Sequence, residues 1–124
     1  MTYDIQIDEG KSPSMLIVSA DFTKGQFVGL NLQPAVAGAD ILGVCIRDSV
    51  TNNPISLACI GTFYLDVEVA AASTLNVGDE LELKDASTLQ AQSTGVVVAK
   101  AYESIDNSAG GSAVVKKIPV KIIK

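Results

Sequence analysis

Short apolar runs divide this sequence at intervals of roughly ten residues, with Gly, Pro, Asn, Asp and Ser between them. Runs of this length, rich in Val, Ile and Leu, are typical of β-strands. No window offers the sustained apolar repeat that an amphipathic helix requires. We therefore expect a chain of strands, in these segments: Met15–Ala20, Phe27–Leu32, Ile41–Ile46, Ile55–Val69, Glu80–Leu83, Gly95–Ala101 and Ala113–Ile122.

One segment resembles a helix because three alanines, Ala70–Ala72, follow one another. In Leu65–Val69, just before them, apolar residues alternate with acidic ones. A period of two is the pattern of a half-buried strand. We expect a strand here, with the alanines leading into a turn.

Turn-forming residues mark the ends of several expected strands. Thr51–Pro54 places two Asn residues, which tolerate left-handed backbone, before a Pro, and this order predicts a hairpin tip. Gly78 should take a positive φ just before Glu80–Leu83, a run whose leucines should face inward and whose glutamates should face water. The Gly pair in Asp106–Gly111 predicts another turn before the last strand.

Length and composition fit one mainly β domain. A chain of 124 residues with 48% apolar residues can bury one core but is too short for two. Short, numerous strands hide their edges by closing into a barrel or by covering one another. We expect a small antiparallel β-barrel or sandwich-like domain over residues 15–124, preceded by an extended N-terminal arm and hinge over residues 1–14.

The N-terminal arm has one apolar face. Tyr3, Ile5 and Ile7 alternate with polar residues, and a Gly-Lys-Ser-Pro hinge follows at residues 10–13. Such a segment can form an edge strand of its own domain, or it can add a strand to a partner. Both alternatives stay open, and the second makes Tyr3, Ile5 and Ile7 candidate partner-binding residues.

Aromatic residues are few, with three Phe, three Tyr and no Trp. Two interpretations are open for four of these aromatic residues, Phe22, Phe27, Phe63 and Tyr64. They can form apolar surface for self-association or partner binding, with Phe22 and Phe27 as the candidate residues, or they can belong to the core.

Absent and rare residues restrict the function. Without His, the chain lacks the commonest general base and the commonest transition-metal ligand. A net charge of -5 and a single Arg, Arg47, leave no basic face to follow nucleic-acid phosphates. No apolar run approaches the roughly 18 residues that cross a bilayer, and the N-terminus lacks signal-peptide features. We expect a soluble protein made in the cytoplasm, with no nucleic-acid or membrane partner.

No residue pattern matches a known catalytic or metal-binding motif. A hairpin at Asn52–Asn53 would bring Cys45 and Cys59 near each other. We expect buried thiols there, with a disulfide or a reactive thiol as alternatives. The acidic residues near Asp79 and Glu80 lack the spacing of a calcium loop. We expect no catalytic residue, no metal and no cofactor, although a Ser–Lys hydrolase needs no His and stays open.

Charge is distributed unevenly along the chain. Residues 1–110 carry all fourteen acidic residues and five basic ones, whereas residues 111–124 carry four Lys and no acid. This basic final strand can pair with the acidic body or dock on a neighbour, or its lysines can protect an edge strand from aggregation. Pro119 agrees with an edge position.

Three short Gly-containing segments follow one another in a recognisable order. Asp40–Val44 ends in Gly-Val, Asn76–Leu81 carries Gly-Asp-Glu-Leu, and Gly95–Ala101 reads Gly-Val-Val-Val-Ala-Lys-Ala before a final apolar strand. In this order, over roughly residues 37–123, the sequence resembles the capsid cement, or head decoration, proteins of tailed bacteriophages. The last strand, with its Lys116–Lys117 pair, is more polar than the usual run of that family, and the first 36 residues do not align with it.

The resemblance implies a small, β-barrel-like structural protein of the virion, which binds the major capsid protein on the outer surface of the phage head without a cofactor. It also implies a homotrimer near threefold positions that stabilises the head against expansion or rupture. Two alternatives stay open. One is another virion surface, tail or fibre module that binds host glycans, and the other is the Ser–Lys hydrolase.

Overall fold

The computed structural model describes residues 20–50, 57–58 and 61–123, and these residues contain strands and no helix. The strands are β2 (Phe27–Gly29), β3 (Ile41–Cys45), β4 (Leu57–Ala58), β5 (Gly61–Val69), β6 (Ser73–Leu75), β7 (Glu80–Asp85), β8 (Thr88–Ala91), β9 (Ala99–Ala101), β10 (Ile105–Asn107) and β11 (Val114–Ile122).

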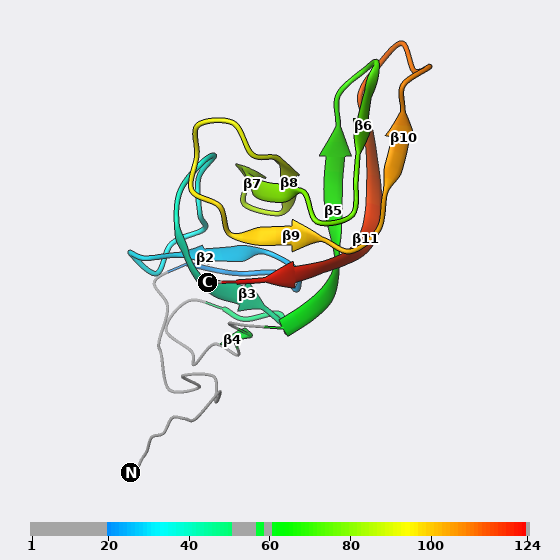
Figure 1. Cartoon of the computed structure of the whole chain (residues 1–124). Coiled ribbons are helices and arrows are strands. Elements are labelled where there is room, and N and C mark those ends of the chain that lie inside the picture. Colours follow the sequence, from blue (N-terminus) through cyan, green and yellow to red (C-terminus); the bar gives the residue numbers. More distant parts are fainter. Residues whose placement is uncertain (1–19, 51–56, 59–60, 124) are drawn as a thin grey trace.

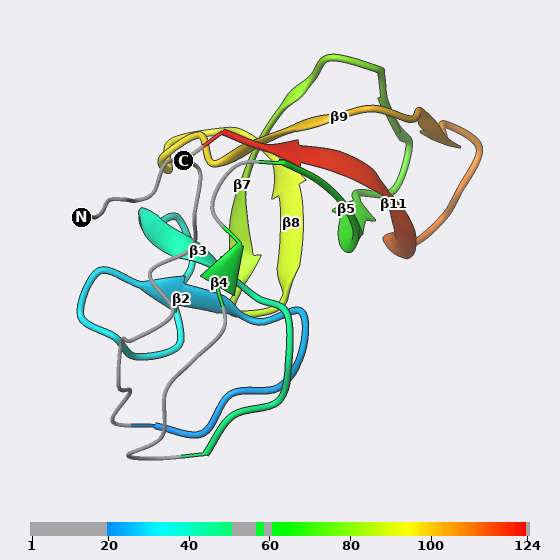
Figure 2. The same cartoon turned by 90° about the horizontal axis from the view of Figure 1, so that it is seen from below.

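Five strands close into a barrel in the order β11-β5-β8-β7-β9, with β9 paired back to β11 (Figures 1 and 2). The longest pair is β5–β11, whose register runs from Gly61 opposite Ile122 to Val69 opposite Val114. β5 and β8 run parallel, whereas the other neighbouring barrel strands are antiparallel. The predicted mainly β barrel is confirmed, with one parallel pair that the sequence did not indicate.

Every barrel strand contributes buried apolar side chains to one core. Val67, Leu83, Leu89, Ala101 and Val120 come from different strands, and each is 0% exposed. Apolar and exposed residues alternate along much of β5 and β11, as expected for strands with one face toward a core. Full burial of a side chain such as Leu contributes about 1.5–3 kcal/mol, so this interior is the main source of stability.

A three-stranded sheet, β2-β3-β4, lies against the barrel. The Phe27 N–H donates to the Ala86 carbonyl at 2.6 Å, and the Phe27 side chain belongs to the same core cluster as the barrel residues. A second, smaller cluster consists of Phe22, Val28 and Cys45. The β2-β3-β4 sheet is therefore attached to the barrel by both backbone bonding and shared core.

Beyond the barrel, the chain forms a projection that we call the extension: the ends of β5 and β11 together with the β6–β10 ribbon (Figure 1). Leu75 and Ile105, which pair across that ribbon, are buried in the barrel's core cluster. Asn107 Nδ2 donates to the carbonyls of Val69 at 3.3 Å, Ala70 at 3.0 Å and Ser112 at 2.9 Å. The buried Asn107 amide therefore links the segment that follows β5 with the segment that precedes β11.

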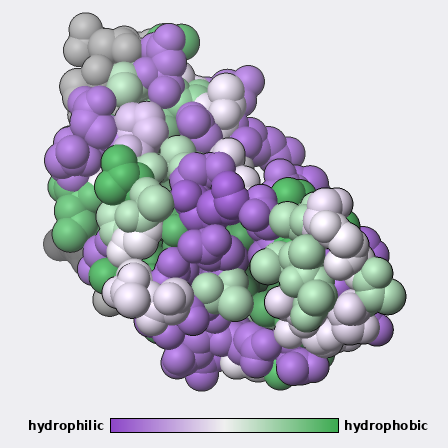
Figure 3. Space-filling view, turned by 90° about the horizontal axis from the view of Figure 1, so that it is seen from above, coloured by the Kyte–Doolittle hydropathy of each residue, from purple (hydrophilic) through white to green (hydrophobic). Residues whose placement is uncertain are grey.

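The tip of the extension is small and uncharged. It consists of residues 70–72 and 109–113, which are Ala, Gly and Ser residues that are exposed, apart from the partly buried Gly110. Figure 3, which looks down on this end of the molecule, shows a pale lobe of these residues beside more hydrophilic surface.

Glu82 is buried, contrary to the prediction that it faces water, and only 5% of the residue is exposed. Its Oε1 accepts hydrogen bonds from the backbone N–H groups of Ser93 at 2.9 Å and Gly95 at 2.7 Å, and its Oε2 accepts one from Gln90 Nε2 at 2.9 Å. The correction has a physical cause: the loop after β8 folds over this side of β7 and binds the carboxylate. These hydrogen bonds, that from Ser93 first, hold the pKa of Glu82 below its usual value.

The same loop requires a glycine. A Cβ on Gly95 would lie 2.6 Å from the Cα of Gly38 and 2.9 Å from Glu82 Oε1. The Val96 N–H also donates to the Gly38 carbonyl at 3.0 Å. The close backbone approach of these two loops is therefore possible only without a side chain at residue 95.

Several predicted strands and turns are confirmed. Leu65–Val69 is strand, Ala71 and Ala72 form the turn after it, and Gly78 has a φ of 92°. Leu81 and Leu83 face inward as predicted. Residues 15–19 of the first predicted strand, the Thr51–Pro54 turn and the N-terminal arm lie outside the described residues.

Other predictions were wrong in detail. The stretch Gly95–Ala101 was predicted as one strand, but only β9 at its end is a strand. The residues before β9 form a loop, from which the Val98 N–H donates to the Leu81 carbonyl at 2.9 Å. The final strand is not an edge throughout, since residues Val120–Ile122 pair with β9 as well as with β5. β6, β8 and β10 were not predicted, and β10 extends into the segment predicted as a turn, Asp106–Gly111.

We expect Glu82→Gln to lower the free energy of unfolding by about 1–3 kcal/mol at neutral pH, because an amide cannot accept hydrogen bonds at both positions. The depressed pKa of the folded state means that the carboxylate stabilises the fold fully above the unfolded-state pKa of about 4.3, and that this stabilisation is lost as the pH falls through the folded-state pKa. Urea unfolding between about pH 7 and about pH 3 should show the gap between wild type and variant closing. Glu80→Gln, at an exposed position of the same strand, is the control; equal losses from both substitutions would contradict the role of Glu82.

Candidate functional site

A groove of about 450 Å³ lies between the end of β3 and the first half of β5. Val44–Ile46 line one side and Phe63–Asp66 line the other. Lys24 and Lys117 also line it, and Lys117 Nζ lies 3.2 Å from Asp66 Oδ1. The groove is therefore mostly apolar, with two lysines and one aspartate at its rim.

The first half of β5 runs along this groove. β5 pairs with β11 over its whole length, but its pairing with β8 covers only Asp66–Glu68. Over Gly61–Leu65, the edge facing away from β11 has no strand partner among the described residues. Because the backbone groups of a strand alternate between its two edges, this edge presents N–H and C=O groups beside the apolar side chains of the groove.

Cys45 lies at the groove as a buried free thiol, 1% exposed. Its Sγ donates to the Arg47 carbonyl at 2.6 Å. Burial raises the pKa of the Cys45 thiol, the hydrogen bond to Arg47 opposes that rise, and the negative charge of Asp48 adds to it. A raised pKa disfavours the nucleophilic thiolate. The prediction of a buried thiol is confirmed for Cys45, and Cys59 lies outside the described residues.

Two acidic side chains on β5 are in ion pairs. Asp66 pairs with Lys117, and Glu68 Oε1 lies 3.6 Å from Lys84 Nζ. Within the described part of the chain, no three acidic, Cys or His side chains are grouped so that they could hold a metal ion. The carboxylates of β5 therefore act as cross-strand partners of lysines.

A serine and two lysines do meet at the groove, which bears on the hydrolase alternative. Ser87 lines it together with Lys24 and Lys117. The Ser87 hydroxyl donates to Asp85 Oδ1 at 3.4 Å, whereas Lys117 pairs with Asp66. No hydrogen bond joins the serine to either lysine among the described residues, so the geometry of a Ser–Lys nucleophile is not formed.

The predicted aromatic contact residues divide into two groups. Phe22 and Phe27 are 2% and 0% exposed, so the surface prediction is wrong for them and the core interpretation holds. The reason is their packing: Phe27 belongs to the main core cluster together with the barrel residues, and Phe22 packs in the smaller cluster with Val28 and Cys45. Phe63 is partly buried, and Tyr64 is 70% exposed. Tyr3, Ile5 and Ile7 lie outside the described residues, and their partner contacts stay a prediction.

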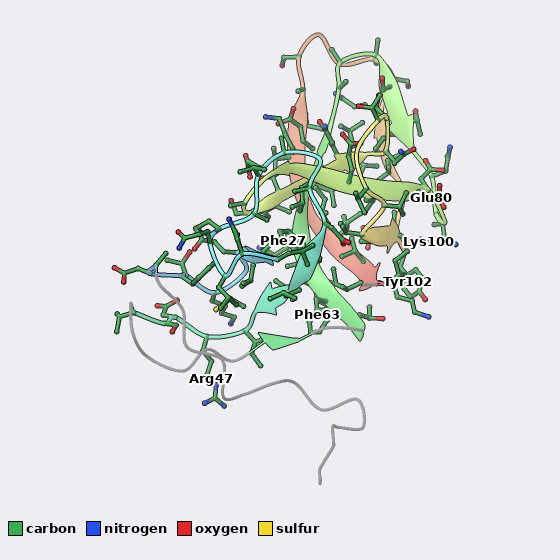
Figure 4. All side chains as sticks on the ribbon, turned by 90° about the vertical axis from the view of Figure 1, so that its left-hand side faces the viewer. Phe27, Arg47, Phe63, Glu80, Lys100 and Tyr102 are labelled. Atoms are coloured by element: carbon green, nitrogen blue, oxygen red, sulfur yellow. The ribbon has the colours of Figure 1, made fainter. Side chains whose placement is uncertain are left out.

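The barrel also carries an exposed aromatic row that the sequence did not indicate. Pro119 is the register partner of Tyr64, and its carbonyl accepts the Tyr102 N–H at 3.0 Å. Tyr102 is 47% exposed and lies on the outer side of the barrel near Lys100 (Figure 4). In the next row, Lys121 stands opposite Lys100. Only the strand register brings these residues together, because they are far apart in sequence.

The comparisons with known proteins do not add to this description. A scan against protein-family models and a search of curated proteins both found no match to this chain. Among the described residues, no helix has the length and apolar character needed to span a membrane.

In a Cys59→Ser background, we expect Cys45 to react with a disulfide reagent at least about tenfold more slowly in the folded protein than in urea, because burial hinders access and raises the thiol pKa. The rate of thiolate release, followed by absorbance at mildly alkaline pH, provides the measurement. Equal rates in the two states would show that the thiol is accessible and would contradict the buried position.

Proposed function

We propose that this chain is a capsid decoration protein, which binds the major capsid protein on the outer surface of a phage head and stabilises it. The proposal assigns binding to the chain and no catalysis. It rests on the resemblance of Asp40–Val44, Asn76–Leu81 and Gly95–Ala101 to that family, together with the way these segments meet in the fold.

The contact between the second and third of these segments is the observation that supports the proposal most. The Gly78 N–H donates to the Ala101 carbonyl at 2.7 Å, and the Ala101 N–H donates to the Asp79 carbonyl at 3.0 Å. Val98 bonds the Leu81 carbonyl in the same region. The second and third of these segments therefore form one structural unit at the barrel, which is what a shared fold requires.

The physical mechanism would be linkage between binding and lattice stability. A protein that binds only the mature lattice stabilises it by an amount set by its concentration relative to its Kd, about 2.7 kcal/mol per site at a hundredfold excess. Symmetry repeats each contact over the shell, and a trimer holding several capsid subunits gains from multivalency. A barrel with one continuous core is a suitably stiff body for such a role.

Co-sedimentation with expanded heads of the encoding phage tests the proposal. We expect the purified chain to pellet with mature heads and not with unexpanded ones, because the stabilising contacts belong to the mature lattice. A chain that stays in the supernatant with both kinds of head would overturn the proposal.

The N-terminal arm is expected to contribute to that binding. Replacing Thr2–Glu9 by a Gly/Ser segment of equal length should weaken co-sedimentation, because it removes the apolar face of Tyr3, Ile5 and Ile7. The equal length keeps the tether, so unchanged binding would exclude these residues as capsid contacts.

The homotrimer is a separate part of the proposal. Light scattering at high protein concentration should give about three times the 12.9 kDa mass of one chain if the trimer forms before binding. A monomer mass under these conditions would contradict a preformed trimer, and assembly on the shell would then be required.

A glycan-binding virion surface, tail or fibre module is the second candidate. The exposed Tyr64 and Tyr102 on either side of Pro119 favour it, because aromatic faces are a common platform for sugar rings. Two results together would select this alternative. The wild type would bind host glycans but not phage heads, and the double variant Tyr64→Ser, Tyr102→Ser would lose the glycan binding.

A further inference from the structure

The outer wall of the barrel carries a row of ring-bearing side chains that crosses three neighbouring strands. Pro119 on β11 is opposite Tyr64 on β5, and its carbonyl accepts the N–H of Tyr102, the residue after β9. Tyr64 is 70% exposed, Tyr102 is 47% exposed, and Pro119 between them is partly buried. Adjacent strands lie about 4.8 Å apart, so this row extends over roughly 10 Å of the wall.

A hydrophilic row lies beside the aromatic one, two residues further along β11. Lys121 is opposite Lys100 on one side and opposite Thr62 on the other. Like charges at directly opposite positions of two strands repel each other. Neither lysine forms an ion pair with another residue of the described part of the chain. An anion bound between these two lysines would therefore offset their repulsion.

Two carboxylates lie at one end of the aromatic and lysine rows. Glu80 on β7 is opposite Lys100, and Glu103 follows Tyr102 (Figure 4). Lys121 lies one strand further from Glu80 than Lys100 does, because β9 separates β7 from β11. The residues opposite Lys121 are Thr62 and Lys100, so neither of its register partners is acidic. Lys121 is thus the cation of this row that is best placed to bind an external anion.

The other edge of the aromatic row also carries a lysine, but that lysine is paired. Lys117 lies two residues before Pro119, and its Nζ is 3.2 Å from Asp66 Oδ1. The two edges therefore differ: one presents two lysines without an ion pair, and the other presents a neutralised pair. An anionic group is expected at the first edge, next to Pro119.

A peptide segment fits this surface poorly. An added strand binds through a free backbone edge. At the lysine pair, β11 is hydrogen-bonded on both sides, to β5 and to β9. The surface therefore offers side chains and no strand edge to a ligand.

Sugar rings suit a surface of this kind. Their C–H faces pack on aromatic side chains, which combine an apolar ring with a polar group. In a β-linked polysaccharide, successive rings follow one another at a spacing similar to that of adjacent strands, and they turn over alternately. Three rings can then lie over Tyr64, Pro119 and Tyr102, with the acidic group of the middle ring directed to Lys121.

We propose that the Tyr64–Pro119–Tyr102 row and the Lys100–Lys121 pair form a binding site for an acidic, β-linked polysaccharide. The sugar rings lie on the row, and a sugar carboxylate binds between the two lysines. The inference rests on the glycan-binding candidate above and specifies its ligand class. It does not depend on binding to phage heads, because the isolated chain carries the whole site.

An NMR titration of the full chain with two matched oligosaccharides tests the proposal. One consists of β-linked glucuronic acid and the other of β-linked glucose, with the same linkage and length, so that they differ only in the carboxylates. At low salt we expect the acidic sugar to bind about fivefold more tightly. Its shift changes should centre on the amides of Lys100, Tyr102 and Lys121, and those of β8, across the barrel, should not move.

Lysine variants test the recognition of the carboxylate. Lys121→Gln should weaken binding of the acidic sugar about threefold and leave binding of the neutral sugar unchanged. Lys116→Gln is the matched control, because Lys116 is an exposed lysine of the same strand whose side chain alternates to the other face. It should change neither affinity.

Tyrosine variants test the platform. Tyr64→Ser combined with Tyr102→Ser should weaken binding of both sugars at least about tenfold. Tyr64→Phe keeps the ring and should keep most of the affinity. Both tyrosines are exposed, so these variants should fold, and unchanged amide shifts of Leu81 and Leu83 in the core would verify this.

The possible results separate the inference from the candidate on which it rests. Equal affinity for the two sugars, with no effect of Lys121→Gln, would overturn the acidic ligand class and leave the glycan candidate standing. Binding of neither sugar would overturn both. Polyglutamate that binds as tightly as the acidic sugar, with no loss in the tyrosine variants, would assign the lysines to an acidic protein partner and overturn the proposal.

Discussion

The pairing of β9 with β11 closes the barrel, and closure determines which backbone edges the molecule can offer to a partner. A closed barrel has no free edges along its paired strands. β5 is longer than its pairing with β8, however, so one side of Gly61–Leu65 has no strand partner among the residues that the structure describes. The groove at this edge is thus a consequence of strands of unequal length within one closed barrel.

Glu82, on β7, fixes a loop to the barrel wall. Its carboxylate binds the loop between β8 and β9, and that loop approaches Gly38 closely enough to exclude a side chain at Gly95. A buried carboxylate is tolerated because three donors satisfy it. The barrel wall, the β8–β9 loop and the connection before β3 are therefore held together by the hydrogen bonds of Glu82, by the Val96–Gly38 backbone bond and by the close approach of Gly38 and Gly95.

The sequence predicted the longer strands because their alternation reports directly on one buried face, as in Leu65–Val69. It could not predict β6, β8 and β10, which have only three or four residues and become strands through their partners. Glu82 was misplaced because alternation assumes that the second face meets water, whereas a loop distant in sequence covers it. The groove and the Tyr64–Pro119–Tyr102 row could not be predicted either, since they depend on strand register.

Two exposed features of the structure are relevant to the proposed binding role. The extension carries an uncharged tip, and the exposed Tyr64 and Tyr102 lie on the barrel wall. A partner could contact either of them without any change in the barrel core. In the proposed role, attachment of each chain at more than one point would strengthen binding to a symmetric lattice.

Electron cryomicroscopy of mature phage heads mixed with saturating protein would show capsid decoration directly. We expect additional density of the size of this barrel on the outer surface, arranged about the threefold positions of the shell. Heads whose outer surface stays bare at saturating protein concentration would contradict it.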